Sequence, residues 1–475
     1  MTGKVPDMPH WPARTAPALA DHYIRALAIS LACYALLGRG FAYVGMPPLF
    51  VGEALYCLGL MVLLRSGCII GVFAAFPNLV LLALAAWTLA RTLPFLPVYG
   101  MDALRDAVIV LYGGFTLIVC GLLMERPERL HRGLRLFSRF AAFFGAAAGI
   151  AFSVQTLLGN HGLLPSWPTS GVPLLSMKPG DVAVHLAGSA VFALLFFRRI
   201  IWPWVALLLA GMAMVGVGNR GGLLAIASTV GIALPFSGRI RQLSGIILAG
   251  GVVLAAAWLL DLNVHLTERE RPLSVEQLFI NLFSIFDESE HGDLDGTKAW
   301  RLRWWQTIAD YTLHGEYFWS GKGFGIGLAA ADGFGGVTPP GAPELRSPHN
   351  INMTILARAG VPGLVLWTLL LLSWFGTMAY NLVVARIRSE EAWFRLFLFV
   401  ACYVAAVLIN ASFDVALEGP MLGIWFWVLI GFGLGAAQIY RTQRAVFATG
   451  SRSPLARPRR VLLAASAPTT SRSAS

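Results

Sequence analysis

The chain has 475 residues, of which 57% are hydrophobic and only 13% charged, and its formal net charge is +11. Soluble domains carry about 25% charged residues, so the composition excludes an ordinary soluble enzyme and favours a membrane protein. The basic residues cluster in short loops between apolar segments, which is typical of membrane topology and not of nucleic-acid binding. The five cysteines lie within or beside apolar segments without a CxxC pair, so neither a zinc site nor a disulfide framework is predicted.

The apolar segments predict an all-α fold, a polytopic membrane bundle of about 12 helices, because each crossing needs about 20 apolar residues. Residues 1–20 are expected to be a cytoplasmic N-terminal segment, and the first span, 24–44, is expected to be an uncleaved anchor. Because Gly38, Arg39 and Gly40 interrupt this span, its helix is expected to end near Leu37. Nine spans are predicted within residues 21–261 and three within residues 353–440. In chain order they cover residues 24–44, 47–64, 70–90, 104–123, 136–158, 182–197, 200–217, 222–236, 243–261, 353–380, 393–412 and 420–440.

Every arginine cluster falls after an even-numbered predicted span, and this pattern gives the expected orientation. They lie at residues 126–135, 198–199, 239–241 and 386–388, and in the basic tail 441–475, which is expected to be disordered. The positive-inside rule places these clusters and both termini in the cytoplasm. The long, partly helical loop 262–352 and the shorter loop 159–181 are then expected on the outer side of the membrane.

Three basic groups from separate segments fall on this outer side. Arg220 joins two spans with almost no loop, Arg301 lies in a tryptophan-rich helical stretch, and His349 precedes the tenth span. Two arginines can clamp a diphosphate through forked, charge-assisted hydrogen bonds, and a histidine can take a proton from a sugar hydroxyl. Each group also has an ordinary interpretation: a snorkelling arginine in a tight turn, an interfacial amphipathic helix, and a structural hydrogen-bonding histidine.

Further candidate substrate-binding residues surround these three. Arg303 could replace Arg301 in its role, Arg346 and Asn350 flank His349, and the pair Asp181 and His185 begins the sixth span. Two more carboxylates, at positions 414 and 418, lie between the last two spans and could orient an arginine or a sugar, or cap a helix. The glycine-rich residues 321–327 predict a tight loop, and the acidic residues 287–295 a solvated loop in preference to a cation site.

Several short motifs have the order and spacing found in one family of membrane enzymes. They are residues 219–225, Arg301 with Trp305, and residues 321–327, 347–350 and 360–363. Over residues 205–440 the sequence resembles the O-antigen ligase/polymerase superfamily. The resemblance implies a metal-independent inverting glycosyltransferase of the membrane-embedded C-type fold, without a cofactor, in the bacterial inner membrane. Arg220 and Arg301 would bind the diphosphate of an undecaprenyl-diphosphate-linked glycan at the periplasmic face, and His349 would act as the base or position it.

The acceptor that the resemblance implies is the lipid A core for a ligase, or a second lipid-linked glycan for an O-antigen or exopolysaccharide polymerase. A protein acceptor is disfavoured because no additional soluble domain is evident. The alternative class is a secondary transporter, since twelve spans are typical of transporters. Against it, no internal repeat is evident and few charges fall in the middle of a span. The expected partners are therefore membrane lipids and lipid-linked glycans, and no nucleic acid.

Overall fold

The computed structural model describes residues 19–240 except 48 and 169, residues 292–335 and residues 345–446. The described chain is helical apart from one antiparallel pair of two-residue strands, β1 (Gly45–Met46) and β2 (Leu49–Phe50). The predicted ninth span, much of the predicted outer loop and the basic tail lie outside the described residues. The predicted domain boundaries therefore stay predictions.

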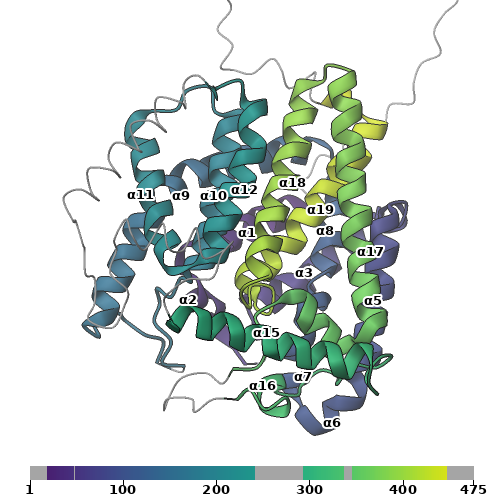
Figure 1. Cartoon of the computed structure of the whole chain (residues 1–475). Coiled ribbons are helices and arrows are strands. Elements are labelled where there is room, and N and C mark those ends of the chain that lie inside the picture. The colour runs from purple at the N-terminus through teal and green to yellow at the C-terminus, as the bar shows by residue number, and fades with distance from the viewer. Residues whose placement is uncertain (1–18, 48, 169, 241–291, 336–344, 447–475) are drawn as a thin grey trace, which may run out of the picture.

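The helices assemble into one bundle of long helices with short helices at its lower end (Figure 1). In chain order they are α1 (Leu19–Leu37), α2 (Arg39–Ala42), α3 (Val51–Ser66), α4 (Ile69–Val72), α5 (Phe76–Thr92), η1 (Leu93–Phe95), α6 (Leu96–Tyr99), α7 (Met101–Leu111), α8 (Gly114–Glu125), α9 (Glu128–Asn160), α10 (Pro179–Phe196), α11 (Trp202–Gly218), α12 (Arg220–Ala233), η2 (Leu234–Ser237), α15 (Gly292–Leu313), α16 (Leu328–Ala331), α17 (Ile351–Ile387), α18 (Glu391–Ala411) and α19 (Pro420–Thr442).

Eight helical stretches of the described chain are long and apolar enough to cross a membrane. The protein is therefore a multi-pass membrane protein, and the predicted all-α bundle is confirmed. These stretches coincide with eight of the twelve predicted spans. Three other predicted spans coincide with helices that are too short or not apolar enough to be counted with these eight. Helix α1 has charged residues in its first two turns, α3 has only 16 residues, and α11 is a shorter apolar helix. The total of twelve stays a prediction.

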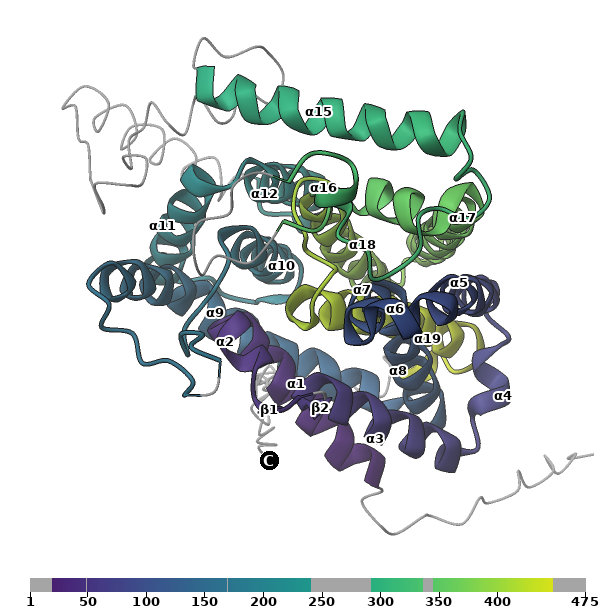
Figure 2. The same ribbon diagram turned by 90° about the horizontal axis from the view of Figure 1, so that it is seen from below.

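Helix α10 forms the centre of one half of the bundle. Its residues from Gly180 to Leu195 are all buried, and it packs against α9, α11, α12 and α18, as Figure 2 shows from below. Small residues make this possible, since a Cβ atom at Gly188 would lie 2.7 Å from the ring of Tyr403. Close approach at small residues is a common way for helices to associate in membranes.

The arginine-rich loops gather at one end of the bundle. Arg129 at the start of α9 donates to Asp21 at the start of α1, Arg239 donates to the carbonyl of Phe197 after α10, and Arg395 in α18 donates to the α10 carbonyl of Leu195. These contacts bring Arg239 beside the chain that precedes Arg198, and the cluster at 126–135 beside the start of α1. Most of the predicted basic tail lies outside the described residues. Helix α15 runs across the opposite, lower end of the bundle (Figure 1). Which end faces the periplasm stays a prediction.

A kink in α17 seats the glycine-rich loop at this lower end. Gly360 has a φ of 68°, and a Cβ atom there would lie 2.6 Å from the carbonyl oxygen of Phe318. The backbone amides of Lys322 and Gly323 donate to the α17 carbonyls of Ala357 and Arg358. Residues 321–327 thus form the tight loop that the sequence predicts, held against the first turns of α17.

Candidate active site

The loop between α18 and α19, residues 412–419, is the common contact of the predicted site residues. Arg301 of α15 donates from Nη1 to the Phe413 carbonyl oxygen at 3.2 Å. Nδ1 of His349 lies 3.7 Å from Oδ1 of Asp414. Gly221 packs on the Phe413 side chain, since a Cβ atom there would lie 2.9 Å from its Cβ. Arg301 and His349 therefore contact adjacent residues of one loop. Arg220 directly precedes Gly221, which packs on the same loop.

Asn219 and the glycines after it determine where Arg220 lies. The Asn219 side chain caps α12 by accepting a hydrogen bond from the Gly222 amide at 2.6 Å. A Cβ atom at Gly222 would lie 2.6 Å from the Cβ of Ala183, so the first turns of α10 and α12 are in close contact. Arg220, the first residue of α12, is half-buried at this junction. The exposed amides and positive dipole of a helix N-terminus favour an anion.

Two tryptophans fix the position of α15. The Trp304 indole is fully buried and donates to Oδ2 of Asp332 at 2.7 Å, within a small core formed with Ile308 and Leu328. The Trp305 indole donates to the carbonyl of Pro348 at 2.8 Å. Helix α15 is thus anchored to protein on the sides that bear these indoles. Arg301 lies one turn before Trp305 and shares its face.

The environment of Arg301 suits a second, anionic partner. Its Nε atom is buried and has no hydrogen-bond partner among the described residues. Burial lowers the pKa of Arg301, and the negative charge of Asp414 opposes that shift. An arginine remains protonated at neutral pH in spite of such shifts. A buried donor without an acceptor is unfavourable, so an incoming anion would satisfy it.

His349 has an unusual backbone conformation, with a φ of 54°. It is held between Pro348, whose carbonyl accepts from Trp305, and Asn350, whose side chain caps α17 by accepting from the amides of residues 352 and 353. Such left-handed conformations are uncommon outside glycine and cluster at functional sites. The two flanking contacts therefore present the imidazole toward Asp414.

Asp414 connects the histidine to the rest of the cluster. Burial raises its pKa, but the facing His349 and the positive charge of Lys178 lower it more, so that the pKa lies below its usual range. Asp414 is therefore a carboxylate at neutral pH. Asp181, one turn into α10, interacts electrostatically with both Lys178 and Asp414, and its buried Oδ1 has no hydrogen-bond partner among the described residues.

One of the comparisons with known proteins identifies a family. Residues 204–368 match the family model described as O-antigen ligase. They form a domain of the O-antigen ligase family. The superfamily resemblance in the sequence is thereby confirmed for this range, which includes Arg220, Arg301 and His349. The family comprises membrane glycosyltransferases of the O-antigen ligase and polysaccharide polymerase type, which act on lipid-linked glycans. No curated protein and no solved structure matches the chain.

Two other predicted residues have different surroundings from the cluster. Arg303 is exposed on α15 and does not share the Phe413 contact of Arg301. His185 is buried in α10, where its Nδ1 lies 2.6 Å from the Tyr403 hydroxyl and its ring packs edge-on against Phe144. Their roles in substrate binding stay predictions. Among the described residues, no three His, Cys, Asp or Glu side chains gather as a metal site, and the acidic side chains of residues 287–295 lie outside the description.

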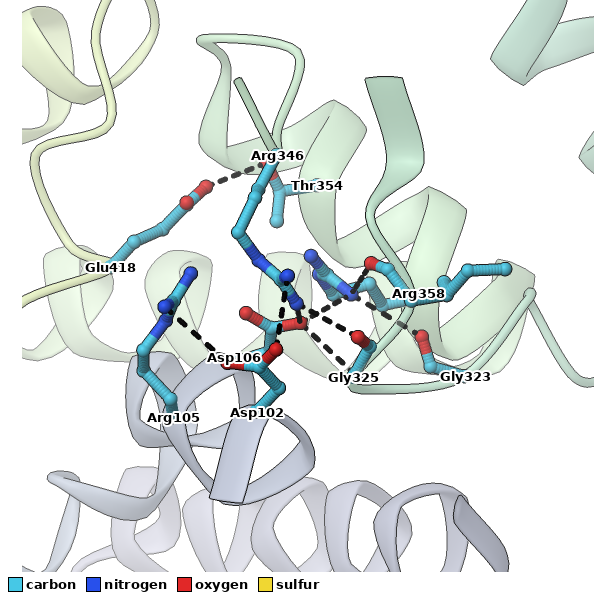
Figure 3. A network of polar contacts seen from close by, with 10 residues as sticks. Asp102, Arg105, Asp106, Gly323, Gly325, Arg346, Thr354, Arg358 and Glu418 are labelled. Carbon is cyan, nitrogen blue, oxygen red and sulfur yellow. Dashed lines mark hydrogen bonds and ion pairs between the residues drawn. The ribbon is translucent and has the colours of Figure 1, made fainter. Parts of the chain in front are cut away.

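Arg346, a predicted substrate contact, belongs to a network of ion pairs that joins α7, the glycine-rich loop and α17 (Figure 3). Its guanidinium lies 3.2 Å from Asp102 and 3.1 Å from Asp106, both on α7, and donates to the Gly325 carbonyl at 2.8 Å. Asp106 also pairs with Arg358 of α17 at 2.9 Å and accepts from the Gly325 amide. The sequence analysis missed both aspartates, although carboxylates at the end of an apolar span need partners.

This network holds the segment that carries His349. Arg346 lies three residues before His349 and pairs with Asp106. Arg358, in the first part of α17, pairs with the same Asp106 side chain. Thr354 of α17 donates to Glu418 in the 412–419 loop at 3.2 Å, so the network continues toward Asp414. Because its guanidinium pairs with two aspartates and donates to the Gly325 carbonyl, Arg346 positions the histidine segment. Its contact with substrate stays a prediction.

Replacing Asp106 with asparagine should unfold this corner of the molecule. The Asp106 and Arg358 side chains are 8% and 2% exposed, and removing one partner of a buried ion pair costs about 3–5 kcal/mol of folding free energy. Asp102→Asn is the matched control, because Asp102 is 46% exposed and an exposed pair contributes about 1 kcal/mol or less. Thermal unfolding in detergent checks this, and equal losses in the two variants would contradict it.

Proposed function

We propose that this protein transfers a glycan from undecaprenyl diphosphate to an acceptor hydroxyl at the periplasmic face of the inner membrane, as an O-antigen ligase or an O-antigen or exopolysaccharide polymerase. The observation that carries the proposal is the meeting of Arg301 and His349 on adjacent residues of the 412–419 loop. A guanidinium and an imidazole from distant segments thus contact the same loop, which supports a role for the first in binding a diphosphate and for the second in accepting a proton.

In this proposal the donor diphosphate lies between Arg301 and Arg220. The unsatisfied Nε of Arg301 and the N-terminus of α12 supply donors for phosphate oxygens. As the bond from the anomeric carbon to the diphosphate breaks, negative charge grows on the leaving oxygen. Two fixed guanidinium charges stabilise that charge without reorganisation. They supply the role that a divalent cation has in other transferases, which supports metal independence.

The acceptor hydroxyl gives its proton to His349 in this mechanism. The Nδ1 atom faces Asp414, which leaves Nε2 as the nitrogen that takes the proton. The acceptor oxygen forms a bond to the anomeric carbon while the bond to the diphosphate breaks, and undecaprenyl diphosphate leaves. A single displacement of this kind inverts the configuration. The Asp414 carboxylate stabilises the imidazolium that forms, as carboxylates do beside catalytic histidines.

The test is reconstitution of the purified protein in liposomes with an undecaprenyl-diphosphate-linked glycan and each of two acceptors. Glycan joined to the lipid A core indicates a ligase, and longer lipid-linked chains indicate a polymerase. Activity that persists after dialysis against a chelator supports metal independence. Absence of product with both acceptors, together with glycan or solute uptake by the liposomes, would overturn the proposal in favour of a transporter.

A further inference from the structure

A cavity of about 370 Å³ at the arginine-rich end is lined by four arginines and one leucine. It lies far along the bundle from the candidate active site, between α1 and α9, which pack side by side. Arg25 comes from α1, and Arg132, Arg135, Leu136 and Arg139 come from α9. The α9 residues are spaced three and four apart, so they share one face of the helix.

These positive charges are poorly balanced by the described chain. Asp21 pairs with Arg132 at 3.0 Å, but the same carboxylate also pairs with Arg129 at 2.8 Å and Arg126 at 3.8 Å. No ion pair to an acidic side chain is present for the other three lining arginines within the described residues. Several guanidinium groups around one cavity repel one another, and an anion with several acceptor oxygens offsets this.

The position of the cavity along α9 indicates where the anion comes from. Residues 140–160 of α9 contain no charged residue and are long enough to cross the hydrocarbon core, which is about 30 Å thick. The helix of 33 residues is about 50 Å long at 1.5 Å per residue. Its first dozen residues therefore extend beyond the hydrocarbon, and Arg139 lies at the boundary. Lipid phosphates lie at this depth.

We propose that the cavity lined by Arg25, Arg132, Arg135 and Arg139 binds the phosphate of an anionic membrane lipid. The guanidinium groups make forked hydrogen bonds to the phosphate oxygens, while the acyl chains run along the apolar stretch of α9 that follows Arg139. A zwitterionic lipid presents the same phosphate next to a cationic group, which the arginines repel. The site is thus selective for net negative headgroups and is independent of the proposed glycan transfer.

The experiment measures binding of fluorescent phosphatidylglycerol, phosphatidylcholine and inorganic phosphate to the full chain in detergent. The variant is Arg25→Gln/Arg135→Gln/Arg139→Gln, which keeps Arg132 and its contact with Asp21. Removing three guanidinium groups that contact one phosphate is expected to lower phosphatidylglycerol affinity roughly 100-fold, or about 1 kcal/mol for each charge-assisted contact. Phosphatidylcholine should bind weakly to both proteins.

The matched control is Arg65→Gln/Arg199→Gln/Arg441→Gln, which removes the same charge from three exposed arginines outside the cavity. It should lower phosphatidylglycerol affinity less than 5-fold. Equal losses in the two triple variants, or equal binding of the two lipids by the unaltered chain, would overturn the proposal. Tight binding of inorganic phosphate without phosphatidylglycerol binding would also overturn it, because the anion would then come from solution. Thermal unfolding of each variant verifies that the bundle is intact.

Discussion

Replacing His349 with alanine is expected to lower the rate of glycan transfer by about 10²–10⁴-fold, the usual contribution of a positioned general base. The imidazole lies next to Asp414, and histidine is the side chain most often used as a general base. Alanine tolerates a positive φ only slightly less well than histidine, and the substitution removes a partly exposed side chain. The amount of protein in the membrane should therefore not change. Initial rates at saturating donor and acceptor measure the effect.

The control for this variant is His314→Ala, which removes an exposed histidine near the end of α15 and should leave the rate within about 2-fold, as for most exposed positions. Asp414→Asn separates positioning from proton transfer. It keeps the shape of the 412–419 loop but removes the charge that stabilises the imidazolium, so the rate should fall while KM for the donor changes little. A normal rate in His349→Ala would remove the histidine from the mechanism.

The placement of Arg301 and His349 could be predicted because two independent patterns agreed. Hydropathy and arginine clusters determine which ends of the spans lie together, and they place both residues at one end. Motif order then singled them out from other polar residues. Their contact with the 412–419 loop could not be predicted, because a loop of eight residues with two carboxylates has many conformations, and nothing local selects Asp414 over Glu418 as the partner of His349.

Sequence patterns indicate which polar residues have a special role more reliably than they indicate which groups those residues contact. Arg346 was predicted as a substrate contact because it precedes His349, yet its guanidinium pairs with two aspartates from a span more than two hundred residues earlier. His185 has the spacing of a cavity residue, yet aromatic rings and Tyr403 surround it. In both cases a tertiary contact decides the environment, and tertiary contacts are not encoded in local spacing.

In the fold, too, some features follow from local sequence and others depend on tertiary contacts. The end of α1 at Leu37 was predictable, because Gly38 and Gly40 follow and glycine disfavours a helix interior. The extension of α9 beyond its predicted span could not be obtained from hydropathy, since its first turns are rich in arginine. Those turns are helical because tertiary contacts, including the pairing of Arg129 with Asp21 and Glu125, compensate for their charge.

The matched ligase domain does not contain the whole candidate site. Residues 204–368 include Arg220, Arg301 and His349, whereas Lys178, just before α10, and Asp414, in the 412–419 loop, lie on either side of that range. The 412–419 loop is therefore a place where the chain outside the matched domain can tune the histidine and the arginine. We expect differences in acceptor choice to arise there and in loop 159–181, because the proposed function assigns the donor diphosphate to residues of the matched range.

Replacing Arg301 with glutamine is expected to lower kcat by about 10²–10³-fold, the range seen when one donor to a developing negative charge is removed. Arg301→Lys should recover only part of the rate. Lysine keeps the charge, but its ammonium cannot satisfy the Phe413 carbonyl and two phosphate oxygens with the planar fork of arginine. The loss should fall mainly on kcat, since the charge on the diphosphate increases as it leaves.

The thermal unfolding temperature is a second measurement that tests the role of Arg301, because it is expected not to fall when activity falls. Arg301 is half-buried, and its buried Nε lacks a hydrogen-bond partner among the described residues, which is unfavourable for folding. Arg301→Gln should therefore leave the thermal unfolding temperature unchanged or raise it while activity falls. Arg303→Ala, two residues away on the exposed face of α15, should change neither quantity. If Arg303→Ala lost activity and Arg301→Gln kept it, the diphosphate would be held by the other face of α15, and the proposed arrangement of Arg301, His349 and Asp414 would be wrong.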